Sequence, residues 1–232
     1  MFTLNHFVWL AISAAVAAAY FFWGKKHTEM QVLNVMCGVA IASEVVKIFC
    51  MTEFDGTRAV IDPGILPFHL CSIQIFMILI LRFGKNEKLR EFLYALSYPA
   101  AIVGAMLSLL IPTEGVAFNE VHPYQYFLYH AFLVGFGYWT FYARKHIFTK
   151  KSVLQALIGL LLCAWLAFYV NALSGENFMF IVEPPLENLP YLNVDHGWGV
   201  YFAHLICAAG VGLVLPYLPV LLRKTKKDKV AV

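Results

Sequence analysis

The sequence predicts an all-α polytopic membrane protein built as a bundle of seven transmembrane helices. Composition is the first observation, since 61% of the residues are hydrophobic and 13% are charged, against roughly 25% charged residues in soluble domains. The second is that the apolar residues form seven runs near the length of about 20 residues that crosses a bilayer. The third is that basic and acidic loops alternate between these runs.

The seven runs fill the chain, so residues 1–232 are expected to form a single transmembrane domain. Each run is expected to be helical, because a lipid-facing segment must satisfy its backbone hydrogen bonds internally. Pro99 and the pair Gly135 and Gly137 are the expected kink points in the fourth and fifth spans. The predicted spans are residues 6–23, 31–51, 66–81, 89–111, 125–143, 152–173 and 198–222.

The distribution of charge between the runs predicts the orientation. Lys and Arg gather in the first, third and fifth loops and in the C-terminal tail. The second, fourth and sixth loops are acidic, with Arg58 as their one basic residue. Because Lys and Arg favour the cytoplasmic side of a membrane, we expect the N-terminus outside and the C-terminus in the cytoplasm.

Composition also argues against several classes of partner and site. The net charge of +3 is small and its basic residues sit in short loops and the tail, so no nucleic-acid partner is expected. The five cysteines lie in or beside apolar runs without a Cys-X-X-Cys pair, which disfavours a disulfide framework and a thiolate zinc site. A disulfide between Cys50 and Cys71 is the minor alternative. No cofactor is expected.

Polar side chains from five spans fall in one slab of the bundle. Position converts to depth at about 1.5 Å per residue, and the predicted topology puts this slab in the outer half of the membrane. Polar groups inside lipid are costly, so each needs a partner or a function. The residues are Glu44, His69, Cys71, His130, Asn171 and His204, with Gln74 one turn below Cys71.

Several of these residues have a purely structural interpretation as well. Glu44 and Lys47 are three residues apart on one helix face and are expected to pair. For His204, hydrogen bonding between helices is the favoured interpretation. Asn171 and Gln74 are equally compatible with capping or bridging helices.

Cys71 is the candidate nucleophile. Pro67 is typical of the first turn of a helix, which would place Cys71 one turn later, where the helix dipole favours the reactive thiolate. Two positions on a helix diverge by about 200°, so His69 is not expected to act as base for Cys71. His130 is the candidate base, with Asn171 as orienter or oxyanion donor. His69 is expected to donate to a substrate carbonyl or headgroup.

Four short motifs occur in a fixed order: Leu-Pro-Phe-His-Leu-Cys at residues 66–71, Tyr-His at 129–130, Val-Asn at 170–171 and Asn-Phe-Met-Phe at 177–180. With this spacing, residues 65–191 resemble the YwaF-type bacterial integral membrane proteins, which are similar to the eukaryotic transmembrane protein 164 family. The chain departs from that pattern at Tyr129 and Ala131, and in residues 195–199.

The resemblance implies a seven-helix acyltransferase in a bacterial cell membrane. An acyl chain would pass from a phospholipid through a cysteine to a lysophospholipid. By motif, the cysteine corresponds to Cys71 and the histidine to His130, while Asn177 belongs to the fourth motif and is a candidate for binding or orienting the substrate. The outer loop that contains this motif, residues 174–197, is interpreted either as a lid over the site or as a plain connection in the membrane interface.

The residues leave two other functions open. In the first, His69, His130 and His204 bind zinc and Glu44 acts as base in a lipid hydrolase. In the second, the polar slab is the substrate pocket of a small-molecule transporter or binding protein. The preferred hypothesis is a phospholipid transacylase of the outer leaflet that forms a thioester on Cys71, with phospholipid and lysophospholipid as substrates.

Overall fold

The computed structural model describes residues 2–56, 58–112, 115–185 and 191–222, so the basic tail from residue 223 onward lies outside the described residues. Each predicted run contains a helix. The helices are α1 (Leu4–Gly24), α2 (Glu29–Met51), α3 (Leu70–Phe83), α4 (Glu87–Leu110), α5 (Val121–Arg144), α6 (Lys150–Ser174), α7 (Trp198–Val214) and the short α8 (Leu218–Leu221), which follows α7 after a 3-10 turn (Leu215–Tyr217).

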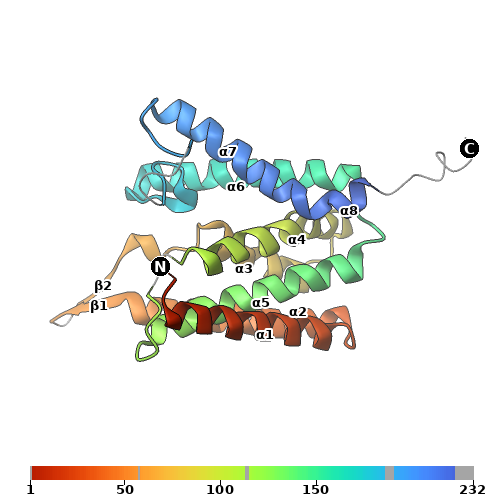
Figure 1. Cartoon of the computed structure of the whole chain (residues 1–232), viewed down its shortest axis with the longest axis horizontal. Helices are drawn as coiled ribbons and strands as arrows, with labels where there is room; N and C mark the ends of the chain where they lie inside the picture. The colour runs from red at the N-terminus through yellow and green to blue at the C-terminus, as the bar shows by residue number, and fades with distance from the viewer. Residues whose placement is uncertain (1, 57, 113–114, 186–190, 223–232) are drawn as a thin grey trace, which may run out of the picture.

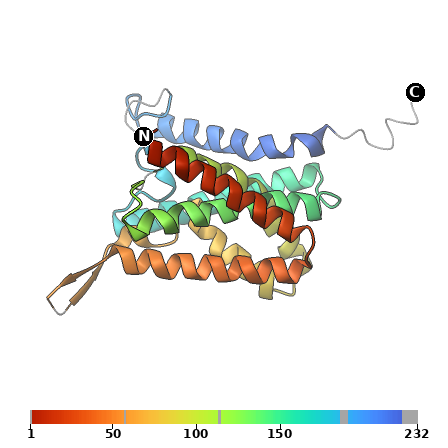
Figure 2. The ribbon, with the colours of Figure 1, turned by 60° about the horizontal axis from the view of Figure 1, so that its bottom comes forward.

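The long helices form a bundle whose axes run along the longest dimension of the molecule (Figure 1). Helices α6 and α7 lie along one side, α1, α2 and α5 along the other, and α3 and α4 between them. The start of α1 and the segment after α2 lie at one end of the bundle, and α8 lies at the opposite end (Figure 2). We call these the α1 end and the α8 end.

Five helices among the described residues are long and apolar enough to cross a membrane: α1, α2, α4, α6 and the continuous run Trp198–Leu221. This confirms a multi-pass helical membrane protein. Helix α3 is apolar but has 14 residues, or about 21 Å at 1.5 Å per residue, less than the roughly 30 Å of a bilayer core. Membrane crossing by α3 and α5, and the orientation of the termini, stay predictions.

Helix α5 is largely surrounded by protein. It packs against α1, α2 and α4, and Phe127, Ala131, Leu133 and Phe136 are fully buried. Helices α4 and α5 are each continuous despite Pro99, Gly135 and Gly137, so the expected kinks do not end either helix. The glycines permit close packing instead: a Cβ at Gly135 would lie 2.7 Å from the carbonyl oxygen of Ala17 in α1.

We predict that Gly135→Ala destabilises the bundle, because the added methyl group meets backbone that cannot rotate away. The expected loss is about 1–3 kcal/mol of unfolding free energy, the usual cost of overpacking. Titration of purified protein in mixed micelles with denaturing detergent measures it. Gly38→Ala is the matched control, because a Cβ there meets nothing within 4 Å and alanine is the better helix former by up to about 1 kcal/mol. Equal effects of the two substitutions would contradict the close α1–α5 contact.

The segment between α2 and α3 departs from the prediction. Where a loop was expected, β1 (Thr52–Asp55) and β2 (Arg58–Ile61) form an antiparallel hairpin in which Thr52 pairs with Ile61. The hairpin projects from the α1 end of the bundle (Figure 2). A 3-10 turn follows at Pro63–Ile65. The predicted start of the third span at residue 66 is wrong, since α3 begins at Leu70.

Charged side chains join three helices at the α8 end. The Glu29 carboxylate, at the start of α2, forms ion pairs with Arg90 of α4 and Arg144 of α5. The Tyr94 hydroxyl donates to the same carboxylate at 2.7 Å, and the Arg144 guanidinium lies 4.7 Å from the centroid of the Tyr94 ring. One carboxylate therefore holds α2, α4 and α5 together by compensating two arginines.

Candidate active site

The N-terminus of α3 presents Cys71 differently from the sequence prediction. His69 is the N-cap, with φ −70° and ψ 149°, and Cys71 is the second helical residue. Pro67 therefore precedes the helix and is not part of its first turn. A proline two residues before the N-cap fits the extended backbone that leads into the helix.

The first turn of α3 keeps backbone donors available beside the thiol. The first hydrogen bond of the helix runs from the Ile73 N–H to the His69 carbonyl at 2.8 Å, so the N–H groups of Leu70, Cys71 and Ser72 have no acceptor within the helix. The His69 side chain does not cap them. Such N–H groups, at the positive end of the helix dipole, are suited to stabilise an anion.

The Cys71 thiol faces α4. A Cβ at Gly104 would lie 3.3 Å from Sγ, so the absence of a side chain there lets the sulfur approach the α4 backbone. Ser108, one turn later on the same face, places its Oγ 3.8 Å from Sγ and donates to the Gly104 carbonyl at 3.0 Å. Gly104 precedes the end of α4 by six residues, which puts the thiol about 9 Å inside the bundle from that end.

Two tyrosines of α5 form hydrogen bonds with the backbone of Cys71 and of Ser108. The Tyr129 hydroxyl donates to the Cys71 carbonyl at 2.9 Å, and the Tyr126 hydroxyl donates to the Ser108 carbonyl at 3.0 Å. His130 follows on the same helix, and its ring centroid lies 4.4 Å from that of Tyr126. The structure thus connects Cys71 to His130 through Ser108 and Tyr126.

A hydrogen bond to the backbone sets the tautomer of His130. Nδ1 lies 2.7 Å from the Tyr126 carbonyl oxygen, which can only accept, so the neutral ring carries its proton on Nδ1. The lone pair is then on Nε2. A backbone acceptor at Nδ1 fixes the tautomer and orients the ring, which is a feature of histidines that act as general bases.

A segment of the loop after α6 covers His69. We call residues 177–182 the strap; it contains a 3-10 turn at Phe178–Phe180. The Met179 N–H donates to His69 Nδ1 at 3.3 Å, and the rings of Phe178 and Phe180 lie 5.4 and 5.2 Å from the His69 ring. The loop therefore packs on the start of α3, as a covering segment would.

The two asparagines of the predicted site organise the strap. Asn171 is buried near the end of α6; its Oδ1 accepts from the Phe178 N–H at 2.8 Å and its Nδ2 donates to the Phe178 carbonyl at 3.1 Å. The Asn177 Oδ1 accepts from the Val182 N–H at 2.9 Å. Both of these Asn171 bonds go to the loop, which fits the bridging interpretation of this residue better than a role as orienter of His130.

The other polar residues of the predicted site have partners other than Cys71. Gln74 is buried and accepts from the Ser97 hydroxyl at 2.6 Å, so it bridges α3 and α4. Glu44 forms the expected ion pair with Lys47 at 2.7 Å. His204 is exposed, and its Nδ1 donates to the Tyr191 carbonyl at 2.7 Å.

The zinc hypothesis does not fit this arrangement. Among the described residues, no three His, Cys, Asp or Glu side chains come together as a group that could hold a metal ion, and His69, His130, His204 and Glu44 are all described. All five cysteines are free thiols, so the alternative disulfide between Cys50 and Cys71 is also wrong.

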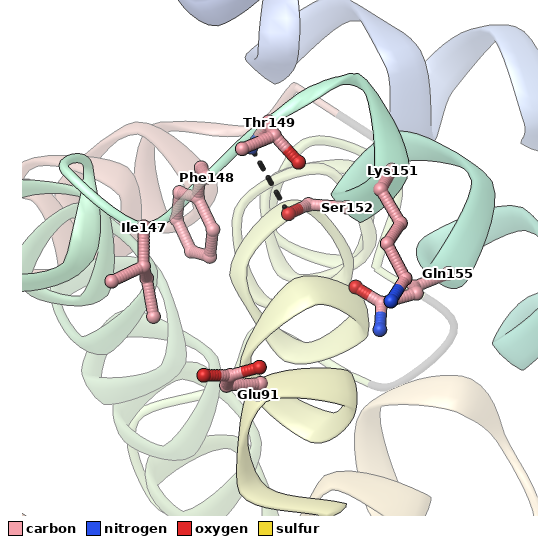
Figure 3. A pocket seen from close by; sticks show the side chains of 7 residues that line it. All are labelled: Glu91, Ile147, Phe148, Thr149, Lys151, Ser152 and Gln155. Atoms are coloured by element: carbon pink, nitrogen blue, oxygen red, sulfur yellow. Dashed lines mark hydrogen bonds between the residues drawn. The ribbon is translucent and has the colours of Figure 1, made fainter. Parts of the chain in front are cut away.

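Two pockets lie away from Cys71. A small one of about 90 Å³ is formed at the α8 end by Glu91, Phe148, Ser152 and neighbouring residues (Figure 3). There the Thr149 N–H donates to the Ser152 hydroxyl at 3.1 Å. A larger apolar groove of about 360 Å³ is lined by α1, α4 and α5 and includes Ala14, Met106 and Tyr138. The thiol instead sits in a packed cluster, half-buried under α4 and α5.

The sequence prediction missed Gly104, Ser108 and Tyr126 as neighbours of the site. The spacing of Gly104 and Ser108 is a detectable signal, because two small residues four apart mark a helix face that another helix approaches closely. Tyr126 offers no comparable signal, since a tyrosine near the end of a membrane helix is common.

The chain is similar to a defined protein family over most of its length. The family model of the TMEM164 family matches residues 1–217. An uncharacterized protein of Treponema pallidum (strain Nichols) is 24% identical over 154 residues, which are 66% of this chain and 63% of that protein. No solved structure matches the chain significantly. The chain is therefore a multi-pass membrane protein that belongs to the TMEM164 family.

Proposed function

We propose that this protein is a cysteine-dependent lipid acyltransferase that works in the outer leaflet of a bacterial cell membrane. The observation that carries the proposal is the placement of a half-buried thiol at an uncapped helix N-terminus, in contact with Ser108 and connected through Tyr126 to a histidine of base-competent tautomer. The four motifs by which residues 65–191 resemble the transmembrane protein 164 family support it, because that resemblance implies acyl transfer through a cysteine. The outer-leaflet assignment rests on the charge of the loops.

The first half-reaction forms a thioester. The Cys71 thiolate attacks the ester carbonyl of a phospholipid that reaches it from the bilayer, and the N–H groups of the first turn of α3 stabilise the oxyanion. His130 Nε2 takes the thiol proton and then gives it to the departing oxygen as the ester C–O bond breaks. A lysophospholipid leaves, and the acyl chain stays on sulfur.

The second half-reaction reverses these roles. His130 Nε2 takes a proton from the hydroxyl of an acceptor lysophospholipid, whose oxygen attacks the thioester. The C–S bond breaks, and the proton returns to the thiol. Both half-reactions exchange one acyl bond for another, so the cycle needs no cofactor. If water replaced the acceptor, the same residues would hydrolyse the lipid.

Intact-mass spectrometry tests this function. Purified protein incubated with a defined phospholipid should gain the mass of one acyl chain, on Cys71 and sensitive to hydroxylamine. The adduct should disappear when a lysophospholipid is added to the wild type. In His130→Ala, which lacks the base for both steps, it should form more slowly and persist once formed. Failure to find an acyl adduct on any cysteine across several phospholipid classes would refute the proposal and leave a transporter or binding protein as the alternative.

A further inference from the structure

The strap is held from two helices at once. Asn171 of α6 bonds to both backbone groups of Phe178. From α7, the Trp198 indole N–H donates to the Ile181 carbonyl at 2.9 Å, and the Tyr201 hydroxyl donates to the Phe180 carbonyl. Asn171 and Tyr201 are buried. These bonds join the strap to both α6 and α7.

The restraints impose an unfavourable backbone on the strap. Met179 and Phe180 have φ values of 57° and 54°, in the left-handed region that residues with a side chain rarely adopt. Such a conformation persists only when its surroundings dictate it, and it is found mostly at functional sites. Here it accompanies the hydrogen bond from the Met179 N–H to His69 Nδ1 at 3.3 Å.

This contact determines the protonation of His69. A backbone N–H can only donate, so Nδ1 must carry a lone pair, and the neutral ring carries its proton on Nε2. His130 has the opposite tautomer, because its Nδ1 faces the Tyr126 carbonyl. The two histidines of the site are therefore prepared for opposite tasks, with His130 as proton acceptor and His69 as hydrogen-bond donor.

We propose that the strap holds His69 as a fixed hydrogen-bond donor, and that its Nε2–H stabilises the oxyanion formed when Cys71 attacks the lipid ester. This inference rests on the proposed acyl-transfer function. As the C–S bond forms, the carbonyl π electrons move onto oxygen, and His69 donates a hydrogen bond to that oxygen without releasing its proton. Collapse of the intermediate restores the carbonyl and breaks the ester C–O bond, and the proton for the leaving oxygen comes from His130.

The position of His69 fits this role. It is the N-cap of α3, two residues before Cys71, beside the N–H groups of the first turn. An oxyanion bound there would combine backbone donors with the imidazole N–H, as oxyanion sites built from backbone and side-chain donors do. The rings of Phe178 and Phe180 pack against the His69 ring, which limits its rotation.

Two measurements on the full-length protein in phospholipid nanodiscs test the inference. The first is ¹⁵N NMR of histidine-labelled protein, with the His69 signals assigned by their loss in His69→Gln. We expect an unprotonated Nδ1 and a protonated Nε2. In Asn171→Ala, which releases Phe178, we expect a mixture of tautomers. A proton on Nδ1, or an imidazolium at neutral pH, would overturn the proposal.

The second measurement is the kinetics of acyl transfer. His69→Phe keeps an aromatic ring but has no donor, and should lose about 100-fold in kcat with little change in KM, the usual effect of removing one oxyanion donor. His69→Gln keeps both an acceptor and a donor and should stay within about 10-fold of the wild type. His146→Gln, an exposed residue at the α8 end, is the control and should match the wild type.

The control is alkylation of Cys71 by iodoacetamide, mapped by mass spectrometry. Its rate should be equal in His69→Phe and the wild type, and equal rates would show that the substitution leaves the thiol and the fold intact. Wild-type kcat in His69→Phe would overturn the donor role and leave the acyltransferase function standing. If the wild type transfers no acyl chain, the proposed function fails and the donor role fails with it, while the NMR result still decides whether the strap fixes His69.

Discussion

Cys71→Ala is expected to lower the rate of acyl transfer by at least about 10⁴-fold, the order of effect seen when a catalytic nucleophile is removed. Binding and oxyanion stabilisation cannot replace the lost covalent step, so the residual rate should not depend on the thiol. Transfer of a labelled acyl chain between defined lipids in detergent micelles measures this rate.

Cys163→Ala is the matched control for this experiment. Cys163 is also a free thiol within a membrane helix, but it is buried in the middle of α6, away from the contacts of Cys71. The control should retain nearly the wild-type rate. Substantial transfer by Cys71→Ala would mean that the acyl chain does not pass through this cysteine.

Glu29→Gln is expected to destabilise the bundle by about 2 kcal/mol or more. Removing one partner from an ion cluster leaves the other charges uncompensated, which costs about 3–5 kcal/mol in fully buried cases. The Glu29, Arg90 and Arg144 side chains are 32%, 13% and 21% exposed, so solvent should reduce the cost. The unfolding free energy in mixed micelles is the quantity to measure.

Glu87→Gln gives the comparison that isolates the role of Glu29. Glu87 also pairs with Arg90, at 3.5 Å, but its side chain is 76% exposed, and surface pairs contribute about 0–1 kcal/mol. It should therefore change stability little. If the two substitutions had the same effect, Glu29 would not be the centre that joins α2, α4 and α5.

Local chemistry explains what could be predicted from the sequence. The helices follow from apolar runs of membrane length, and the Glu44–Lys47 pair follows from helical spacing alone. The place of Cys71 at the start of an apolar helix was also predictable, because the hydrophobic run begins there. The start of α3 was predicted four residues early, since Pro67 is compatible with either a first turn or the extended backbone before it.

The neighbours of Cys71 required the tertiary structure. A membrane helix that is apolar on every side gives no amphipathic face from which its rotation can be read, so the sequence places residues in depth but not in direction. Contact of the thiol with Ser108, the two bonds from Asn171 to the strap, and the three-helix cluster of Glu29 depend on how helices distant in sequence turn toward one another.

The hairpin of β1 and β2 had a local signal that the prediction did not use, because Asp55-Gly56 is a dipeptide typical of hairpin turns. The left-handed turn at Met179 had no comparable signal. By itself, the sequence determined a multi-pass helical protein and the depth of its polar residues, because lipid imposes length and apolarity on each segment separately. The tertiary structure alone decided which polar groups meet, because helix rotation is fixed by packing between segments and not within them.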